Sequence, residues 1–222
     1  MPPCLRAPLL AFLLAGSAAP GLAAQVTVST EAYANAGIGT YASTGGQTFV
    51  VPDANHNVLQ SFRVGFDTPG GSREYVARLM QWLPGTQQLA GPTLFQSAVG
   101  ATAGSTAWSY VTFDVGGVVL DPTATYIFFL SFAGDGGASF ATSGLDTDVD
   151  PYPGGGTFLA DDNLFASADA ATTWIEPFSV YGGVDMGFTA QFTPDATVTP
   201  EPATLALLGT GLAGMAGARR RR

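Results

Sequence analysis

The sequence predicts an all-β protein, built as a two-sheet antiparallel β-sandwich of jelly-roll-like type. Short segments of apolar or alternating apolar and polar residues recur along most of the chain. Glycine, proline, aspartate and asparagine separate these segments, as they do at turns between strands. Between the two termini no segment keeps a helical period of apolar residues for long, so we expect strands throughout.

The expected strands follow from these patterns. In residues 109–115, Val111, Phe113 and Val115 fall on one face and more polar residues on the other, which indicates a half-buried strand. Residues 125–132 are apolar at nearly every position, which indicates a strand covered on both faces. In chain order, strands are expected at residues 26–30, 48–51, 58–66, 75–83, 93–97, 108–115, 125–132, 138–142, 157–160 and 184–193.

Residues 1–24 have the composition of a helical secretory signal peptide. Arg6 is the only charged residue there, an apolar centre follows at 9–15, and small residues precede the expected site for signal peptidase. Cys4 is the only cysteine of the chain and lies in this segment. The remaining body is therefore expected to fold without a disulfide.

Residues 197–222 combine three signals in a fixed order. Pro200, Glu201 and Pro202 come first, and the prolines hold the chain extended and open to a processing enzyme. The uncharged residues 203–218 would reach about 24 Å as a short helix, less than a ~30 Å hydrocarbon core. The last four residues would stay on the cytoplasmic side as a membrane stop: Arg219, Arg220, Arg221 and Arg222.

This order of signals resembles the PEP-CTERM sorting tail of exported proteins from Gram-negative bacteria. The resemblance implies that a membrane-embedded exosortase cuts near Glu201 and Pro202, after the apolar helix has anchored the chain transiently in the inner membrane. The protein would then be released or attached at the cell surface. The apolar and basic parts taken alone would also fit an ordinary single-span anchor.

Residues 25–196 are expected to form one body domain between the signal peptide and the tail. From residue 25 to residue 199 there are three arginines, no lysine and sixteen acidic residues, which gives a formal charge of −13. Such a surface repels phosphate backbones, so nucleic acid is not an expected partner. An acidic surface without lysine is also simply soluble outside the cell.

Acidic residues on both sides of a glycine-rich turn are candidate ligands for calcium. Their oxygen atoms could hold the ion between two loops, and the alternative is an acidic loop in solvent. The pattern departs from an EF-hand, because Pro151 stands where that loop needs glycine and Thr157 where it needs glutamate. The candidate ligands are Asp146, Asp148, Asp150, Asp161 and Asp162.

No catalytic residue is expected in the body. His56 is the only histidine and lies in a polar loop, the body has no thiol, and no serine has a Gly-x-Ser-x-Gly setting. We therefore expect a protein that is not an enzyme and that has no cofactor, with calcium in the acidic loops as the alternative. A jelly-roll glycosidase or lyase with two close carboxylates is the alternative, because acidic residues are many.

Trp174 and Tyr181 are the aromatic residues best placed for stacking on a sugar. Both lie in a loop-rich region, and Trp174 is expected to be exposed. The body also resembles, in residues 60–62, 108–115 and 185–188, the sandwich domains that precede this tail in exported proteins. Some of those domains look like carbohydrate-binding modules.

Taken together, the sequence favours an exported, non-enzymatic surface or extracellular-matrix protein that serves a biofilm or exopolysaccharide layer. Its expected partners are signal peptidase, exosortase, the membrane before processing and an extracellular polysaccharide. The second interpretation is a carbohydrate-binding module, dependent on calcium if the acidic loops hold that ion. The two differ because a carbohydrate-binding module requires an exposed aromatic ring beside acidic or amide groups.

Overall fold

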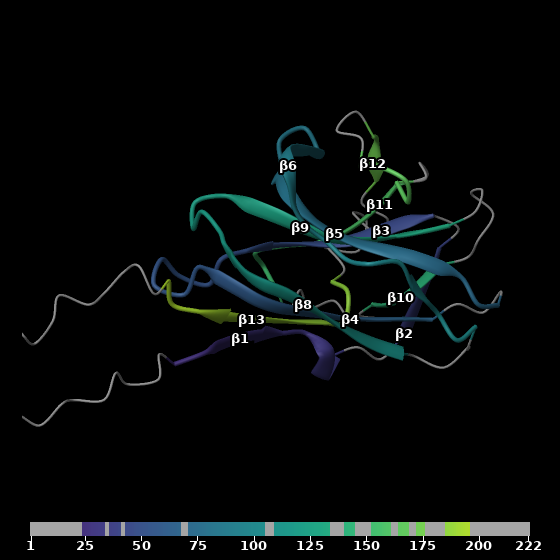
Figure 1. The fold of residues 1–222 in the computed structure, drawn as a ribbon, viewed down its shortest axis with the longest axis horizontal. Coiled ribbons are helices and arrows are strands. Elements are labelled where there is room, and N and C mark those ends of the chain that lie inside the picture. The colour runs from purple at the N-terminus through teal and green to yellow at the C-terminus, as the bar shows by residue number, and fades with distance from the viewer. Residues whose placement is uncertain are drawn as a thin grey trace, which may run out of the picture.

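The computed structural model of the protein describes residues 24–33, 36–40, 43–67, 71–104, 109–133, 140–144, 152–160, 164–168, 172–175 and 185–195. Over these residues the chain forms two antiparallel sheets packed face to face (Figure 1). The predicted two-sheet antiparallel sandwich is thereby confirmed. The helices predicted at both termini lie outside the described residues, and the jelly-roll likeness stays a prediction.

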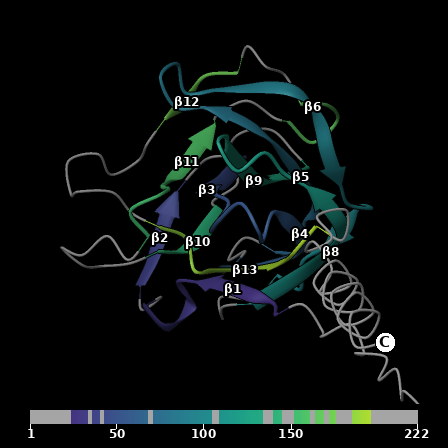
Figure 2. The ribbon, with the colours of Figure 1, turned by 90° about the vertical axis from the view of Figure 1, so that its left-hand side faces the viewer.

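The first sheet is centred on β4, which pairs with β13 and β8 and, at its end, with β10. β1 pairs with the outer side of β13, so the first and last strands run side by side in opposite directions (Figure 2). A short 3-10 helix, η1 (Glu31–Tyr33), follows β1. The strands of this sheet are β1 (Val26–Ser29), β13 (Phe188–Thr193), β4 (Val58–Asp67), β8 (Ser109–Val119), β10 (Phe140–Gly144) and β2 (Ala36–Thr40).

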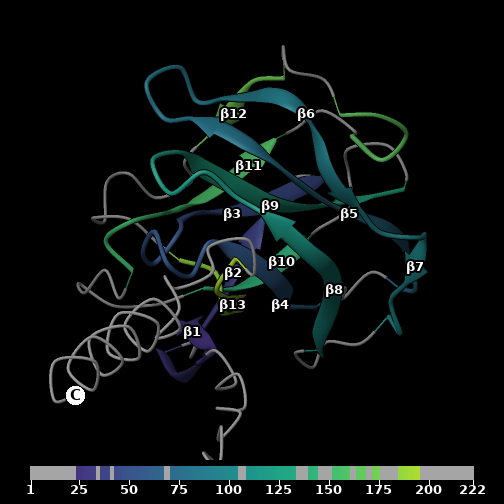
Figure 3. The same cartoon turned by 60° about the vertical axis from the view of Figure 1, so that its left-hand side comes forward.

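The second sheet is centred on β9, which lies between β3 and β5. Figure 1 shows β6 and β12 above β9 and β5, on the side away from the first sheet. β7 pairs with the start of β5 (Figure 3). In sheet order the strands are β12 (Trp174–Ile175), β11 (Thr157–Ala160), β3 (Thr44–Val50), β9 (Thr125–Phe132), β5 (Glu74–Leu83) and β6 (Gln88–Gln96), with β7 (Gly100–Ala101) beside β5.

Aromatic side chains fill the space between the two sheets. Phe62 of the first sheet stacks on Phe128 of the second, with ring centroids 4.3 Å apart, and on Phe188 at 5.3 Å. All three rings are fully buried in one cluster that spans both sheets. Each ring stabilises the fold by about 1.5–3 kcal/mol by leaving water.

The outer face of the second sheet is also covered. Met80, Trp82, Ile127 and Phe129 point away from the first sheet and form a second apolar cluster with Leu164 and Trp174. We call this region the covered face, and the residues 164–168 and 172–175 its cover. The predicted burial of β9 on both sides is confirmed, because every apolar residue from Tyr126 to Phe132 is buried.

The expected strand bounds agree with the structure where the apolar pattern was strong. The predictions for residues 125–132 and 157–160 are confirmed by β9 and β11. β3 begins at Thr44, earlier than residue 48, and its first residues include Gly45 and Gly46, which have no side chain to mark a strand in the sequence. Glycine is needed at position 46, because a Cβ added to Gly46 would lie 2.6 Å from Cβ of Phe129. β13 begins at Phe188 rather than at residue 184.

Other differences have a local cause. β6 starts at Gln88 and β8 extends to Val119, because a bulge or irregular register lets each strand continue past the point where its alternation ends. β2, β7 and β12 were not predicted from the sequence. They are short or rich in glycine and gain their pairing only from a neighbouring strand. In the described part of the chain, no helix has the length and apolar character needed to cross a membrane.

Candidate functional site

The outer face of the first sheet is polar over four adjacent strands. Phe188 and Phe192 of β13 point into the core, so Thr189 and Gln191 between them point outward. The same alternation turns polar side chains outward on the neighbouring strands. We call the following set the polar face: Thr27 and Ser29 of β1, Glu31 of η1, Thr189 and Gln191 of β13, Ser61 and Arg63 of β4, and Tyr110, Thr112 and Asp114 of β8.

Strand register arranges most of the polar face in two rows that cross all four strands. One row consists of Thr27, Gln191, Ser61 and Asp114. The other consists of Ser29, Thr189, Arg63 and Thr112. Adjacent strands in a sheet are about 4.8 Å apart and alternate residues of a strand about 7 Å apart, so the face is a lattice of hydrogen-bonding groups.

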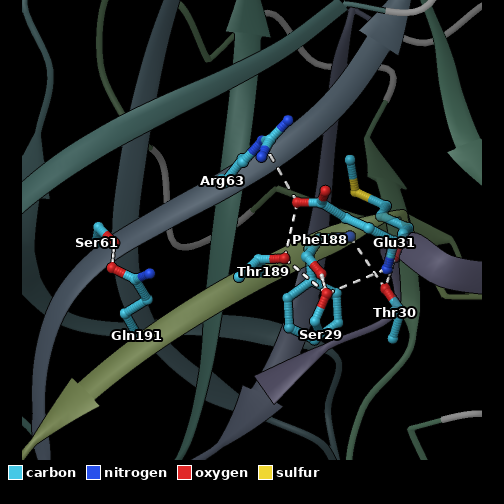
Figure 4. A network of polar contacts seen from close by, with 9 residues as sticks. Ser29, Thr30, Glu31, Ser61, Arg63, Phe188, Thr189 and Gln191 are labelled. Atoms are coloured by element: carbon cyan, nitrogen blue, oxygen red, sulfur yellow. Dashed lines mark hydrogen bonds and ion pairs between the residues drawn. The ribbon is translucent and has the colours of Figure 1, made fainter. Parts of the chain in front are cut away.

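A closed set of hydrogen bonds holds one corner of this lattice (Figure 4). The Ser29 and Thr189 hydroxyl oxygens are 2.6 Å apart, and Thr189 Oγ1 donates to Glu31 Oε1 at 2.7 Å. The backbone N–H of Glu31 donates to Ser29 Oγ at 3.3 Å. Because the Ser29 and Thr189 hydroxyls can both donate and accept while the Glu31 carboxylate accepts, the three side chains orient one another.

Arg63 joins the same corner to Tyr110. Its Nε lies 3.5 Å from Glu31 Oε1, and the carbon at the centre of its guanidinium lies 4.7 Å from the Tyr110 ring centroid. Gly65 of β4 is the register partner of Tyr110, so no side chain stands opposite the ring. The guanidinium lies over the ring, and this stacked pair, the Arg63–Tyr110 platform, borders the hydroxyl rows.

Several polar groups of the lattice remain open to a ligand. Ser61 Oγ donates to Gln191 Oε1 at 2.9 Å, which leaves the Gln191 amide nitrogen with its two N–H donors unpaired among the described residues. The hydroxyls of Thr27 and Thr112 are likewise without a protein partner in this part of the chain, and both residues are exposed. Donors and acceptors therefore face outward next to the Arg63–Tyr110 platform.

The charge of the polar face is close to balanced, unlike that of the body. The face has one arginine and two acids, Glu31 and Asp114. Of the other two arginines in the body, Arg78 is 1% exposed under the cover and Arg73 lies in the connection before β5. The polar face therefore offers an accessible cation, Arg63, beside two rows of hydroxyl groups.

The predicted exposure of Trp174 is wrong. The side chain is 3% exposed and packs edge-on against Trp82 at 5.6 Å and Phe129 at 5.5 Å. The physical reason is that the apolar outer side of β5 and β9 needs a cover, and Trp174 supplies part of it. A buried indole cannot stack on a sugar, so the structure does not place the predicted glycan platform at Trp174.

The remaining predicted site residues lie outside the described residues. These are Tyr181, the candidate calcium ligands, and the residues of the sorting motif and membrane stop. Among the residues that are described, no group of three or more histidine, cysteine, aspartate or glutamate side chains could hold a metal ion. Calcium binding at Asp146, Asp148, Asp150, Asp161 and Asp162 stays a prediction.

His56 lies in the predicted loop and pairs with its own turn. Its Nδ1 is 3.0 Å and 2.9 Å from the two carboxylate oxygens of Asp53, which also accepts the backbone N–H of Asn55. The hydrogen bond with the His56 side chain is the main reason that the pKa of Asp53 lies below its usual value. The contacts give both residues a role in holding this turn.

Part of the polar face follows from the pattern of the sequence, and the rest does not. The alternation in residues 109–115 placed Tyr110, Thr112 and Asp114 on the outer side of β8, and this is where they lie. It gave no indication that Arg63 would lie over Tyr110 or that Thr189 would meet Ser29. Those contacts depend on pairing between segments far apart in the chain, which periodicity within one segment does not reveal.

Comparisons with known proteins agree with the predicted tail. Residues 198–222 match the PEP-CTERM protein-sorting motif, which confirms the predicted sorting tail and implies export and exosortase processing. No curated protein matches the chain.

Two solved structures are similar in fold. One is the clostridial cysteine protease Cwp84 after propeptide cleavage, with a TM-score of 0.49 and 14% identity over 77% of this chain and 40% of that chain. The other contains the cysteine protease and lectin-like domains of Cwp84, a surface layer associated protein of Clostridium difficile. It has a TM-score of 0.48 and 13% identity over 77% of this chain and 36% of that chain. The chain thus spans less than half the length of these structures.

Proposed function

We propose that this exosortase-sorted protein is a non-enzymatic component of the extracellular polymer layer, and that its polar face binds a neutral polysaccharide. The sorting tail supports the location. The observation that carries the binding role is the polar face itself, a lattice of hydroxyl, amide and guanidinium groups beside the Tyr110 ring.

The chemistry of the polar face suits a hydroxyl-rich polymer. Sugar hydroxyls both donate and accept hydrogen bonds, and the face offers free donors at Thr27, Thr112 and Gln191. Tyr110 adds an aromatic surface for the apolar side of a sugar ring. Four strands in one layer give a ligand several contacts in a row, which suits a chain rather than a single sugar.

Charge favours a neutral polymer over an anionic one. The body between residues 25 and 199 has a formal charge of −13, which repels a polyanion at long range. On the polar face itself, the guanidinium of Arg63 is shared between Glu31 and the ring of Tyr110. The face therefore lacks a surplus of positive charge with which to hold carboxylate or sulfate groups.

Among the described residues, Glu31, Asp114 and His56 have structural contacts, which supports a non-enzymatic role. Glu31 accepts from Thr189 and pairs with Arg63, and Asp114 accepts the backbone N–H of Gly116 at 3.0 Å. His56 is bound to Asp53 in its own turn. These contacts hold the carboxylates and the imidazole in place for the fold.

The proposal is tested by titrating the purified protein with soluble neutral polysaccharides, a dextran and a β-glucan, and with alginate as a polyanion. We expect binding to at least one neutral polymer and not to alginate. The double change Arg63→Ala and Tyr110→Ala should remove that binding, measured by calorimetry or affinity electrophoresis.

Arg73→Ala is the matched control, because it removes an arginine of the same body that lies off the polar face. Binding that survives the loss of Arg63 and Tyr110, or that is lost equally with Arg73, would show that the polar face is not the site. Failure to bind any of the neutral polymers would refute the polysaccharide role while leaving the sorting tail unaffected.

A further inference from the structure

The two ends of the body leave the sandwich at the same place. β1 begins opposite the end of β13, since Val26 pairs with Phe192. Thr193 at the end of β13 pairs with Val58, and Val58 pairs with Val119 at the end of β8. The chain therefore enters β1 and leaves β13 at one end of the sandwich.

Two loops complete this end. Residues 51–57 connect β3 to β4, and residues 120–124 connect β8 to β9. The loops contact each other, because the backbone N–H of Leu120 donates to the Asn57 carbonyl at 2.8 Å. We call the start of β1, the end of β13 and these two loops the terminal end.

The other end of the sandwich is far from the exit of the chain. β4 runs from the terminal end to this distal end over 10 residues, which corresponds to about 33 Å. The connection before β5 and residues 102–104 lie at the distal end, where the backbone N–H of Thr102 donates to the Arg73 carbonyl at 2.8 Å. The two ends are thus separated by the full length of a strand.

The sorting motif starts close to the terminal end. The structure describes the chain as far as Asp195, and Pro200 is five residues further on. Five residues of fully extended chain reach at most about 18 Å. Any enzyme that cuts near Pro200 must therefore bring its active site within that distance of the point where the body ends.

We propose that the terminal end of the sandwich is the surface that meets the exosortase, and that the short connection after β13 makes this contact part of cleavage. The inference rests on exosortase processing of the tail and is independent of polysaccharide binding. The connection reaches at most about 18 Å, so an enzyme that acts near Pro200 works close to the loops 51–57 and 120–124. During cleavage the distal end of the sandwich faces away from the exosortase.

The experiment places one bulky group at either end of the sandwich. Ala54 at the terminal end and Ala103 at the distal end are both exposed alanines in loops. Each is changed to cysteine in the full-length chain with Cys4→Ala, so that the introduced thiol is the only one. Each variant is then coupled to a long polyethylene glycol maleimide and incubated with membranes that contain the exosortase.

Tail removal is followed by mass spectrometry, with the uncoupled variants as reference. We expect the polymer on Ala54→Cys to slow cleavage several-fold and the polymer on Ala103→Cys to leave the rate near that of the uncoupled protein. A flexible glycine and serine insertion after Asp195, twice as long as residues 194–199, should restore cleavage of the Ala54→Cys conjugate, because it frees the enzyme from the end of the body.

Equal cleavage of the two conjugates would overturn the proposal, as would an insertion that leaves the Ala54→Cys conjugate slow. If the uncoupled protein is not cleaved, the inference fails at its premise of exosortase processing. Polysaccharide binding is measured separately and tests the polar face, so its result does not affect the proposal about the terminal end.

Discussion

The outer faces of the two sheets differ in polarity and in exposure to solvent. The polar face of the first sheet is open, with exposed Thr27, Arg63 and Thr112, whereas the outer face of the second sheet is apolar and lies under the cover. β8 alternates between buried and exposed residues, and β9 is buried on both sides. One sheet is therefore covered on both sides, and the other has one face exposed to solvent.

The covered face also contains a buried cation. Arg78 is 1% exposed, and its Nε donates to Gln96 Oε1 at 2.9 Å while Nη2 donates to the Phe165 carbonyl at 2.9 Å. Its Nη1 donates to the Leu164 carbonyl. Burial lowers the pKa of the Arg78 guanidinium from its usual value. On the polar face, by contrast, the side chain of Arg63 is 44% exposed.

The largest effect on stability should come from the covered face. Phe129 of β9 is fully buried under the cover. Phe129→Ala should therefore cost about 3–5 kcal/mol of unfolding free energy, as other large core truncations do. Thr112→Ala on the polar face should stay within about 0.5 kcal/mol. Urea unfolding followed by circular dichroism measures both. Similar losses for the two variants would refute the contrast between the faces.

Arg78→Met should have the next largest effect, a loss of about 1–3 kcal/mol. Methionine fills the space but cannot donate, so the carbonyls of Leu164 and Phe165 lose their donors under the cover. Removing a buried charge offsets part of that loss. The measurement is urea unfolding together with acrylamide quenching of tryptophan fluorescence, since a loosened cover exposes Trp174.

Arg73→Met is the control for this change, because Arg73 lies outside the cover. It should alter neither the stability nor the quenching. If Arg78→Met were as stable as the parent protein and equally protected from acrylamide, the two hydrogen bonds from Arg78 to the Leu164 and Phe165 carbonyls would not be what holds residues 164–168 in place.

How much the sequence predicted depends on whether a feature is local. The alternation in β8 and the continuous apolar run in β9 predicted which strand is open and which is covered on both sides, and both predictions are confirmed. These patterns are properties of one strand and the layers on either side of it.

Features that depend on distant segments were not predictable in this way. The residues next to Trp174 in the sequence do not indicate whether its side chain is buried. Its burial results from contact with the apolar outer side of β5 and β9. The rows of the polar face join residues that are far apart in the chain, such as Ser61 and Gln191, which are 130 positions apart. Their register is set by the whole sheet, including its bulges, and not by the period of any one strand.

The smallest effect should come from the ion pair on the polar face. Glu31→Gln keeps the shape of the side chain and an acceptor for Thr189 Oγ1 but removes the charge opposite Arg63. Because the pair is 3.5 Å apart with side chains 21% and 44% exposed, we expect a loss of at most about 1 kcal/mol, and less at high salt. Asp114→Asn is the matched control, since Asp114 accepts only a local backbone N–H on the same face. Urea unfolding at low and high salt distinguishes the cases: a loss for Glu31→Gln that is large and independent of salt would mean that this corner of the polar face is held as firmly as the covered face.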